Sequence, residues 1–214
     1  MNDLRYYGTY ARFDTLSKKD AAPLLGADNL VGDLFTIDFE NEDGRLVAWL
    51  VNRFGARIGY LDESVSRNLN ICRARSWTSR AYLSFVAFTD TPEPGIYWGQ
   101  VALICSDPHY DEAVDAFAQR VSALLCDGIR PDVDLSDSGI AAVLRNDGTW
   151  MTENRAPYPT KKHGTAILKK TRKLSEKMIE QGRQGNIGCY VVSIAFIVIV
   201  LALIAFGLHM IGLF

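Results

Sequence analysis

Hydrophobic and polar positions alternate in short runs through the first half of the chain, a pattern that indicates β-strands. The runs are rich in β-branched and aromatic residues, and turn-forming residues separate them. The expected strands are residues 4–13, 33–39, 45–51, 57–61, 82–89 and 97–105. Residues 17–25 have the pattern of one short helix. Six short strands within about a hundred residues predict a small β-barrel or a strongly bent antiparallel sheet.

Two amphipathic helices are expected after the strands. Asp107 and Pro108 suit the start of the first helix, and Gly128 suits its end. Its apolar stripe consists of Val114, Phe117, Val121, Leu124 and Leu125. A second helix is expected over residues 137–145. Together the patterns predict an α+β fold in which two helices pack on the sheet.

The following segment is basic and amphipathic. After a proline-containing linker at residues 148–163, residues 164–183 combine an apolar stripe with a basic face. This pattern predicts a juxtamembrane helix lying on anionic lipid headgroups. The expected headgroup contacts are Lys169, Lys170, Arg172, Lys173 and Lys177. The alternative is a solvated spacer whose lysines only set membrane topology.

A long uncharged stretch follows. Residues 189–214 contain no Lys, Arg, Asp or Glu, and 22 of these 26 residues are apolar. A helix of about 20 such residues spans ~30 Å, so residues 187–211 are expected to cross a bilayer. With basic residues before the span and none after it, the positive-inside rule places the N-terminus in the cytoplasm and the C-terminus outside. The sequence thus predicts a single-pass, tail-anchored protein of the cell membrane. A small-residue edge at Gly185, Cys189 and Ser193 leaves weak helix-mediated self-association open.

Charge and cysteine content refine this organisation. Residues 1–154 hold 14 basic and 23 acidic residues, a net charge of −9, whereas residues 155–188 hold nine basic and two acidic residues, +7. The near-neutral total of −2 therefore hides an acidic β-rich domain (residues 1–106) with its helical extension (residues 107–147) and a basic collar. The four cysteines form no CxxC and no close pair in the sequence, which suits a reducing compartment.

Several residues in the first third are arranged as in a known family. The matching positions are Leu4-Arg5-Tyr6-Tyr7, Asn41 with Asp43, and Gly55-Ala56-Arg57-Ile58-Gly59-Tyr60-Leu61 followed by Ser64 and Leu69. In order and spacing they resemble the HIRAN domain, a small β-barrel fused to helicase-like transcription factors and also found in bacteria. The resemblance covers about residues 4–70. It departs from the family where Gly44 and Arg45 replace an Asn-Ala pair, and residues 14–30 look like an insertion.

The resemblance implies capture of a single-stranded DNA end. Arg5 and Tyr6 would hold phosphate and base, and Asp43 would accept a hydrogen bond from a hydroxyl. The chain carries no helicase motor motif, so DNA remodelling is not implied.

Independently of the resemblance, the chain has no acidic residue between Glu63 and Asp90 and carries arginines with aromatic residues there. This composition suits nucleic acid or an acidic partner, with Arg73, Arg75 and Trp77 as candidate contacts. A solvated loop and strand face is the alternative, and the net charge of −9 opposes long-range attraction of phosphate.

No catalytic motif is recognisable. The sequence has no phosphate-binding glycine loop, GxSxG or HExxH, and Cys105 and His109 lack a third ligand in a metal-site pattern. We expect no metal and no cofactor. The leading interpretation is a non-catalytic binding module for a cytoplasmic protein partner, presented at the membrane. A membrane-tethered nucleic-acid module and a membrane-bound enzyme of unrecognised type are the alternatives.

Overall fold

The computed structural model describes residues 5–17, 21–42, 44–160, 163–173, 175–176 and 196–200. Residues 1–172 form one compact unit and residues 173–214 a second one. All named helices and strands belong to the first unit.

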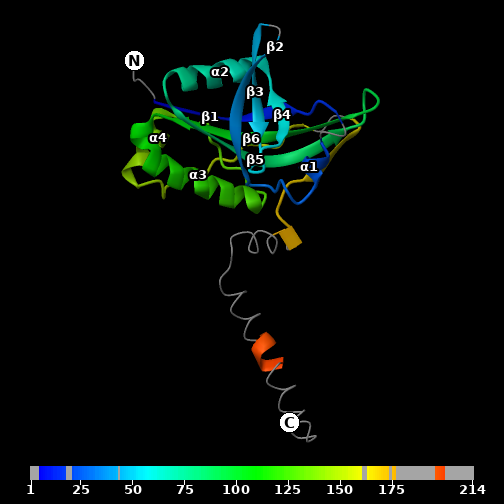
Figure 1. Cartoon of the computed structure of the whole chain (residues 1–214). Helices are drawn as coiled ribbons and strands as arrows, with labels where there is room; N and C mark the ends of the chain where they lie inside the picture. Colours follow the sequence, from blue (N-terminus) through cyan, green and yellow to red (C-terminus); the bar gives the residue numbers. More distant parts are fainter. Residues whose placement is uncertain are drawn as a thin grey trace, which may run out of the picture. The chain divides into compact units, whose positions relative to one another are not determined.

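Six antiparallel strands close into a barrel at the centre of the first unit (Figure 1). They are β1 (Tyr6–Asp14), β2 (Leu34–Glu42), β3 (Arg45–Val51), β4 (Arg57–Leu61), β5 (Thr78–Thr89) and β6 (Ile96–Ser106). Around the barrel the order is β2-β3-β4-β1-β6-β5, and β5 pairs back to β2. Only two residue pairs make this closing contact, Leu34 with Tyr82 and Phe35 with Ala81. Closure leaves few exposed strand edges, which lets a small sheet enclose its own core.

A large hydrophobic cluster fills the barrel. Its fully buried members include Phe13, Phe35, Leu50 and Leu83. The strand alternation that the sequence shows is the cause, because every second side chain of each strand points inward. Helix α2 (Glu63–Ala74) packs against this cluster through Leu69.

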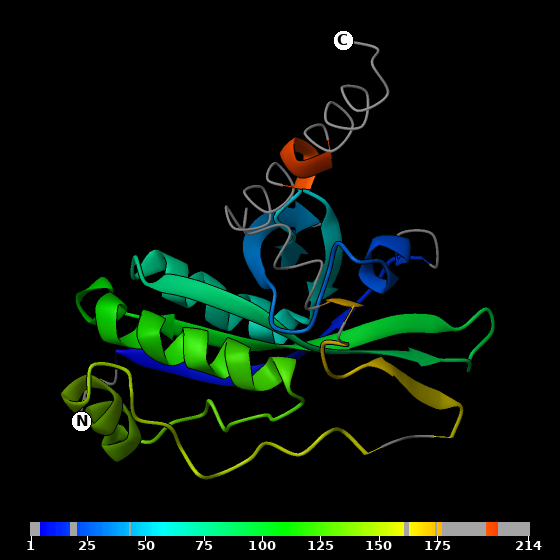
Figure 2. The ribbon, with the colours of Figure 1, turned by 90° about the horizontal axis from the view of Figure 1, so that it is seen from below.

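Two further helices cover the outer face of β5 and β6. Helix α3 (Asp111–Cys126) follows a short 3₁₀ turn, η1 (Pro108–Tyr110), and lies along these strands (Figure 2). It buries Val114, Phe117 and Val121 in a second cluster that includes Tyr82 and Ile104. Helix α4 (Asp137–Arg145) joins this cluster, and α1 (Ala22–Leu25) precedes β2.

Local patterns placed several elements correctly. Strands β3 and β4 and helix α4 have the expected bounds. Other regions differ from expectation. Residues 63–74 form helix α2, although no helix was predicted there. Residues 149–160 lie against the barrel rather than away from it, since Ala156 N–H donates to Arg130 O and Tyr158 packs on Phe85.

The predicted amphipathic helix over residues 164–183 is wrong at its start. Residues Thr165–Lys169 form strand β7, which pairs with β5. Ile167 packs against the buried Phe85 and Trp98 cluster. Pairing with an open strand edge and partial burial of Ile167 therefore outweigh the helical periodicity, since tertiary contacts override local propensity. Most residues after 173 lie outside the described part of the chain.

Among the described residues, no helix is long and apolar enough to cross a membrane. This finding contradicts the expected fold class with its transmembrane helix, the tail-anchored function and the cell-membrane location. Of the expected span 187–211, only residues 196–200 are described, and they are helical. The rest of that span lies outside the described residues.

Candidate functional site

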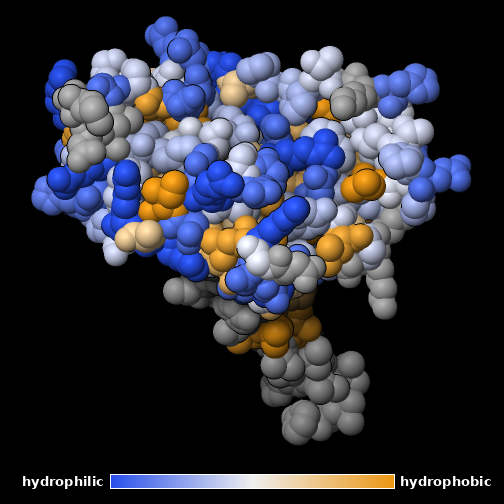
Figure 3. All heavy atoms as spheres, turned by 90° about the horizontal axis from the view of Figure 1, so that it is seen from above, coloured by the Kyte–Doolittle hydropathy of each residue, from blue (hydrophilic) through white to orange (hydrophobic). Residues whose placement is uncertain are grey.

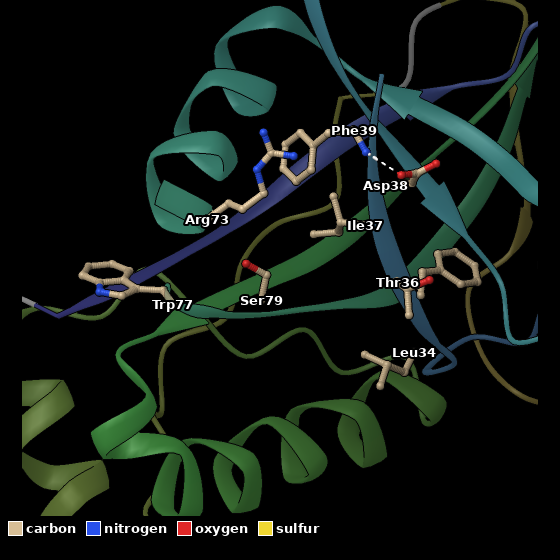
Figure 4. Close-up of a pocket in the computed structure, with 9 residues that line it drawn as sticks. Leu34, Thr36, Ile37, Asp38, Phe39, Arg73, Trp77 and Ser79 are labelled. Atoms are coloured by element: carbon tan, nitrogen blue, oxygen red, sulfur yellow. Dashed lines mark hydrogen bonds between the residues drawn. The ribbon is translucent and has the colours of Figure 1, made fainter. Parts of the chain in front are cut away.

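A pocket of about 440 Å³ opens where β2 and β5 diverge (Figure 4). Residues 34–39 of β2 form one wall, and Arg73, Trp77 and Ser79 form the other. The pocket exists because the two strands pair only at Leu34 and Phe35. Beyond these residues, among the described strands, β2 has a partner on one side only. The main-chain groups on its other edge therefore face the pocket region.

Arg73 lies across the end of this pocket. Its guanidinium sits 4.2 Å from the ring centroid of Phe39, and Figure 4 shows the two side chains face to face. Its Nη2 donates to Asn70 Oδ1 at 2.8 Å. Arg73 makes no ion pair with a described carboxylate, so a positive charge on an aromatic platform remains available to a ligand.

Trp77 separates the first pocket from a second one of about 240 Å³. The second pocket is lined by Tyr6, Tyr7, Asn68, Ile71, Cys72, Arg75 and Trp77. The Arg75 guanidinium lies 5.3 Å from the Trp77 ring centroid and, like Arg73, has no ion pair with a described carboxylate. We call the two pockets together the Trp77 groove.

The end of α2 holds Trp77 at this position. Ser76 has φ 57°, in the left-handed region, and directly follows the C-cap residue Arg75. Ser76 N–H donates to Arg73 O at 2.9 Å, and Trp77 N–H donates to Cys72 O at 2.9 Å. These two bonds make a Schellman motif, which satisfies helix carbonyls and turns the chain into β5. Two arginines and a tryptophan are thereby brought together by one helix terminus.

Carboxylates near the groove are already neutralised. Asp38 lines the first pocket, but Arg57 donates to it at 3.0 Å and also pairs with Glu40. The buried Arg80, in turn, is held by Asp111 and Asp115. Arg73 and Arg75 come from the acid-free stretch noted in the sequence. In the groove they have no acidic partner among the described residues.

The structure brings together three of the sequence-predicted site residues, Arg73, Arg75 and Trp77. Tyr6 also lines the second pocket, but its hydroxyl donates to Val133 O at 2.8 Å, and burial raises its pKa. Arg5 lies 3.4 Å from Asp107 and lines neither pocket. Asp43 lies outside the described residues.

The expected headgroup contacts take other roles where they are described. Lys169 Nζ donates to Gly26 O at 2.6 Å and Asn29 O at 2.9 Å. Arg172 donates to Asp33 Oδ1 at 2.7 Å. Both basic side chains therefore fasten the β7 segment to the loop before β2. Lys170 and Lys173 are exposed, and Lys177 lies outside the described residues.

Sequence reasoning missed the β2 wall of the groove. The alternation along β2 places Phe35, Ile37 and Phe39 on one face, with Phe35 buried and the other two half-buried. That alternation was visible in the sequence, but the divergence from β5 that opens the pocket was not. Among the described residues, no group of three or more His, Cys, Asp or Glu side chains is placed to hold a metal ion.

No family model matches the chain, and no curated protein matches it. The resemblance to the HIRAN domain therefore stays a prediction. Functional inference rests on the geometry of the Trp77 groove.

Proposed function

We propose that this chain binds single-stranded nucleic acid in the Trp77 groove. The observation that carries the proposal is the pairing of Arg73 with Phe39 and of Arg75 with Trp77, with no described carboxylate on either arginine. Aromatic rings and guanidinium groups without an acidic partner are the combination that binds single-stranded nucleic acid.

Each part of the groove supplies one kind of contact. Trp77 offers a ring on which a base can stack, at about 1–3 kcal/mol per base, and Phe39 holds the Arg73 guanidinium at the pocket. Arg73 and Arg75 offer charge to phosphate oxygens. Thr36, from β2, adds a hydroxyl at the pocket wall. Single-stranded ligands fit this arrangement because their bases are free to leave the stack and enter pockets.

One face of the described surface is mainly polar (Figure 3). On the described face that Figure 3 shows, hydrophobic side chains form separate spots within a mainly hydrophilic surface. Large protein partners more commonly dock on contiguous apolar patches. The net charge of −9 over residues 1–154 weakens long-range attraction, so binding is expected to depend on direct contacts and low salt.

Fluorescence anisotropy with a labelled single-stranded oligonucleotide and the full chain tests this function. We expect Trp77→Ala to weaken binding about tenfold, the loss of one stacked base. Arg73→Ala and Arg75→Ala are each expected to weaken it as well.

Arg12→Ala is the matched control. Arg12 also lies over a tryptophan, 4.3 Å from the Trp98 ring centroid, but it is paired with Asp14 and lines neither pocket. It should bind like the unmodified chain. Absence of binding at low salt, or equal affinity of all four variants, would overturn the proposed function.

A further inference from the structure

A further pocket, of about 340 Å³, lies between the coil that precedes helix α4 and the coil that follows it. The two coils run antiparallel at one end, where Asp132 N–H donates to Asn154 O at 3.0 Å and Pro131 forms a bridge with Arg155. Beyond these contacts the coils separate, and the pocket opens between them and the start of α4. It shares no lining residue with the Trp77 groove.

The barrel fixes one wall of this pocket. The Tyr6 hydroxyl of β1 donates to Val133 O at 2.8 Å, and the Val133 side chain is fully buried. Asp132 and Asp134 flank this anchored residue, and both line the pocket. The two aspartates therefore stand on backbone that is held by contacts with the barrel.

These two carboxylates supply hydrogen-bond acceptors. Asp132 Oδ1 accepts from Asp134 N–H at 3.0 Å, and neither side chain forms an ion pair with a described basic residue. The remaining carboxylate oxygens are therefore available to a ligand. Their negative charge repels phosphate, so this pocket does not extend the proposed nucleic-acid site.

Uncharged side chains on the other walls supply donors as well as acceptors. Thr152 is 8% exposed, and its hydroxyl oxygen accepts from Asn154 N–H at 3.1 Å, which leaves the hydroxyl proton to be donated. The Asn154 side chain carries both an N–H₂ donor and a carbonyl acceptor. Ser136 and Ser138, whose hydroxyl oxygens lie 2.9 Å apart, complete the polar lining.

Trp150 adds an apolar surface to this polar lining. The residue is half-buried and packs against the cluster that joins α3 and α4 to the barrel. Part of its indole lines the pocket, where the C–H groups of a ligand can pack on it. We call this cavity the Trp150 pocket.

We propose that the Trp150 pocket binds a neutral sugar. Each sugar hydroxyl both donates and accepts hydrogen bonds, which matches walls of carboxylates, hydroxyls and one amide, and the C–H face of the ring matches the indole. A cation offers donors only and would leave the donors of Thr152 and Asn154 without acceptors. The volume lies within the range of small-ligand pockets. This activity is separate from nucleic-acid binding in the Trp77 groove.

Saturation-transfer difference NMR on the full chain tests the proposed sugar site. The probes are the methyl glycosides of glucose, galactose, mannose and N-acetylglucosamine, each titrated into the millimolar range. We expect saturation of the ring protons of at least one glycoside. Asp134→Asn, a change at an exposed side chain, should weaken its binding about tenfold, because hydrogen bonds to a charged acceptor are the stronger ones. Trp150→Ala should weaken it by about the same factor.

Two matched variants control for charge and for the other binding site. Glu153→Gln removes an exposed carboxylate that neighbours the pocket in sequence but does not line it. Trp77→Ala removes the tryptophan of the Trp77 groove. Both variants should bind the glycoside like the unmodified chain, and glucose 6-phosphate should give no saturation because of the two carboxylates.

Two results would overturn the sugar site. One is the absence of saturation for all four glycosides, whether or not butylammonium, a probe for a cation site, binds instead. The other is equal affinity of Asp134→Asn, Trp150→Ala and the unmodified chain for the glycoside. Asp134→Asn keeps the test decisive even if Trp150→Ala does not fold.

Discussion

The main-chain N–H of Trp77 donates to the carbonyl oxygen of Cys72 at 2.9 Å. This single bond joins the ring that divides the groove to the last turn of α2, where Cys72 belongs to the barrel's buried cluster. It forms because Ser76, between α2 and β5, adopts a left-handed conformation. The position of Trp77 is therefore a property of how the helix ends, and the helix end can be tested directly.

Replacement of Ser76 by glycine should stabilise the protein by about 0.5 kcal/mol. The left-handed conformation costs a residue with a Cβ roughly 1–2 kcal/mol, and glycine removes this cost. Glycine also has the larger conformational entropy in the unfolded chain, which offsets part of the stabilisation. Chemical denaturation measures the difference in the free energy of unfolding. Ser76→Ala, which retains the Cβ, should give no gain. A loss of stability in Ser76→Gly would show that the left-handed turn does not strain the chain.

The salt dependence of the binding constant should distinguish the contribution of the arginines to nucleic-acid binding from that of the tryptophan. Each arginine that contacts a phosphate contributes about −0.7 to the slope of log K against log salt for single strands. Arg73→Ala and Arg75→Ala should each make the slope shallower by about that amount. Trp77→Ala should lower the affinity and leave the slope unchanged, because stacking releases no counterions. Identical slopes in all variants would argue against phosphate contact by either arginine.

Acid stability should depend on Asp111. Burial alone would raise the pKa of this carboxyl, but hydrogen bonds from Thr78 and Arg80 and the charge of Arg80 lower it overall. A depressed native pKa contributes stability above the unfolded value of about 4, and this contribution disappears as the pH falls through the native value. Asp111→Asn should therefore lower the free energy of unfolding at neutral pH and flatten its decline below about pH 4.

Denaturation midpoints measured across that pH range check the contribution of Asp111. Glu112→Gln removes a neighbouring carboxylate that is exposed at the start of α3, and it controls for the loss of charge at this helix end. A decline in Asp111→Asn as steep as in the unmodified chain would contradict the expected role.

Substitution of lysine for Arg130 should destabilise the protein by about 2 kcal/mol, although the charge is kept. Arg130 is 3% exposed, and its guanidinium lies 4.2 Å from the Tyr10 ring centroid and 4.8 Å from that of Tyr158. It also donates to Pro157 O at 2.9 Å and to Gln100 Oε1 at 2.6 Å. An ammonium group reproduces neither the planar stacking nor the two-directional donation.

Thermal unfolding followed by circular dichroism measures the effect of Arg130→Lys. The control is Arg120→Lys, on the exposed side of α3, which should leave the midpoint unchanged. Equal midpoints for the two variants would show that charge alone, and not the guanidinium plane, satisfies this site.

The β-rich part of the fold could be predicted where the apolar and polar residues of a single strand alternate clearly. Strands β3 and β4 alternate clearly and are bounded by turn residues, and their limits were correct. Helix α2 was missed because its exposed face is polar and contains asparagine, serine and arginine. Two signals could have revealed it. Asp62 caps the helix by accepting from Val65 N–H, and Leu69 and Cys72 lie on one face.

The candidate site could be predicted only in part. The sequence drew attention to Arg73, Arg75 and Trp77 through an acid-free basic stretch, and the structure brings them together in one groove. It did not show that Phe39 would face Arg73, because the two belong to separate elements. The predicted membrane span is contradicted, since no helix among the described residues is long and apolar enough to cross a bilayer.

By itself the sequence determined the local elements, because alternation, helical spacing and capping residues act between near neighbours along the chain. Only the tertiary structure decided the closure of β2 on β5, the pairing of β7 with β5 and the placing of Arg73 against Phe39. These contacts join residues far apart in the chain. Their free energy comes from burial of many side chains at once, so no short stretch of sequence records it.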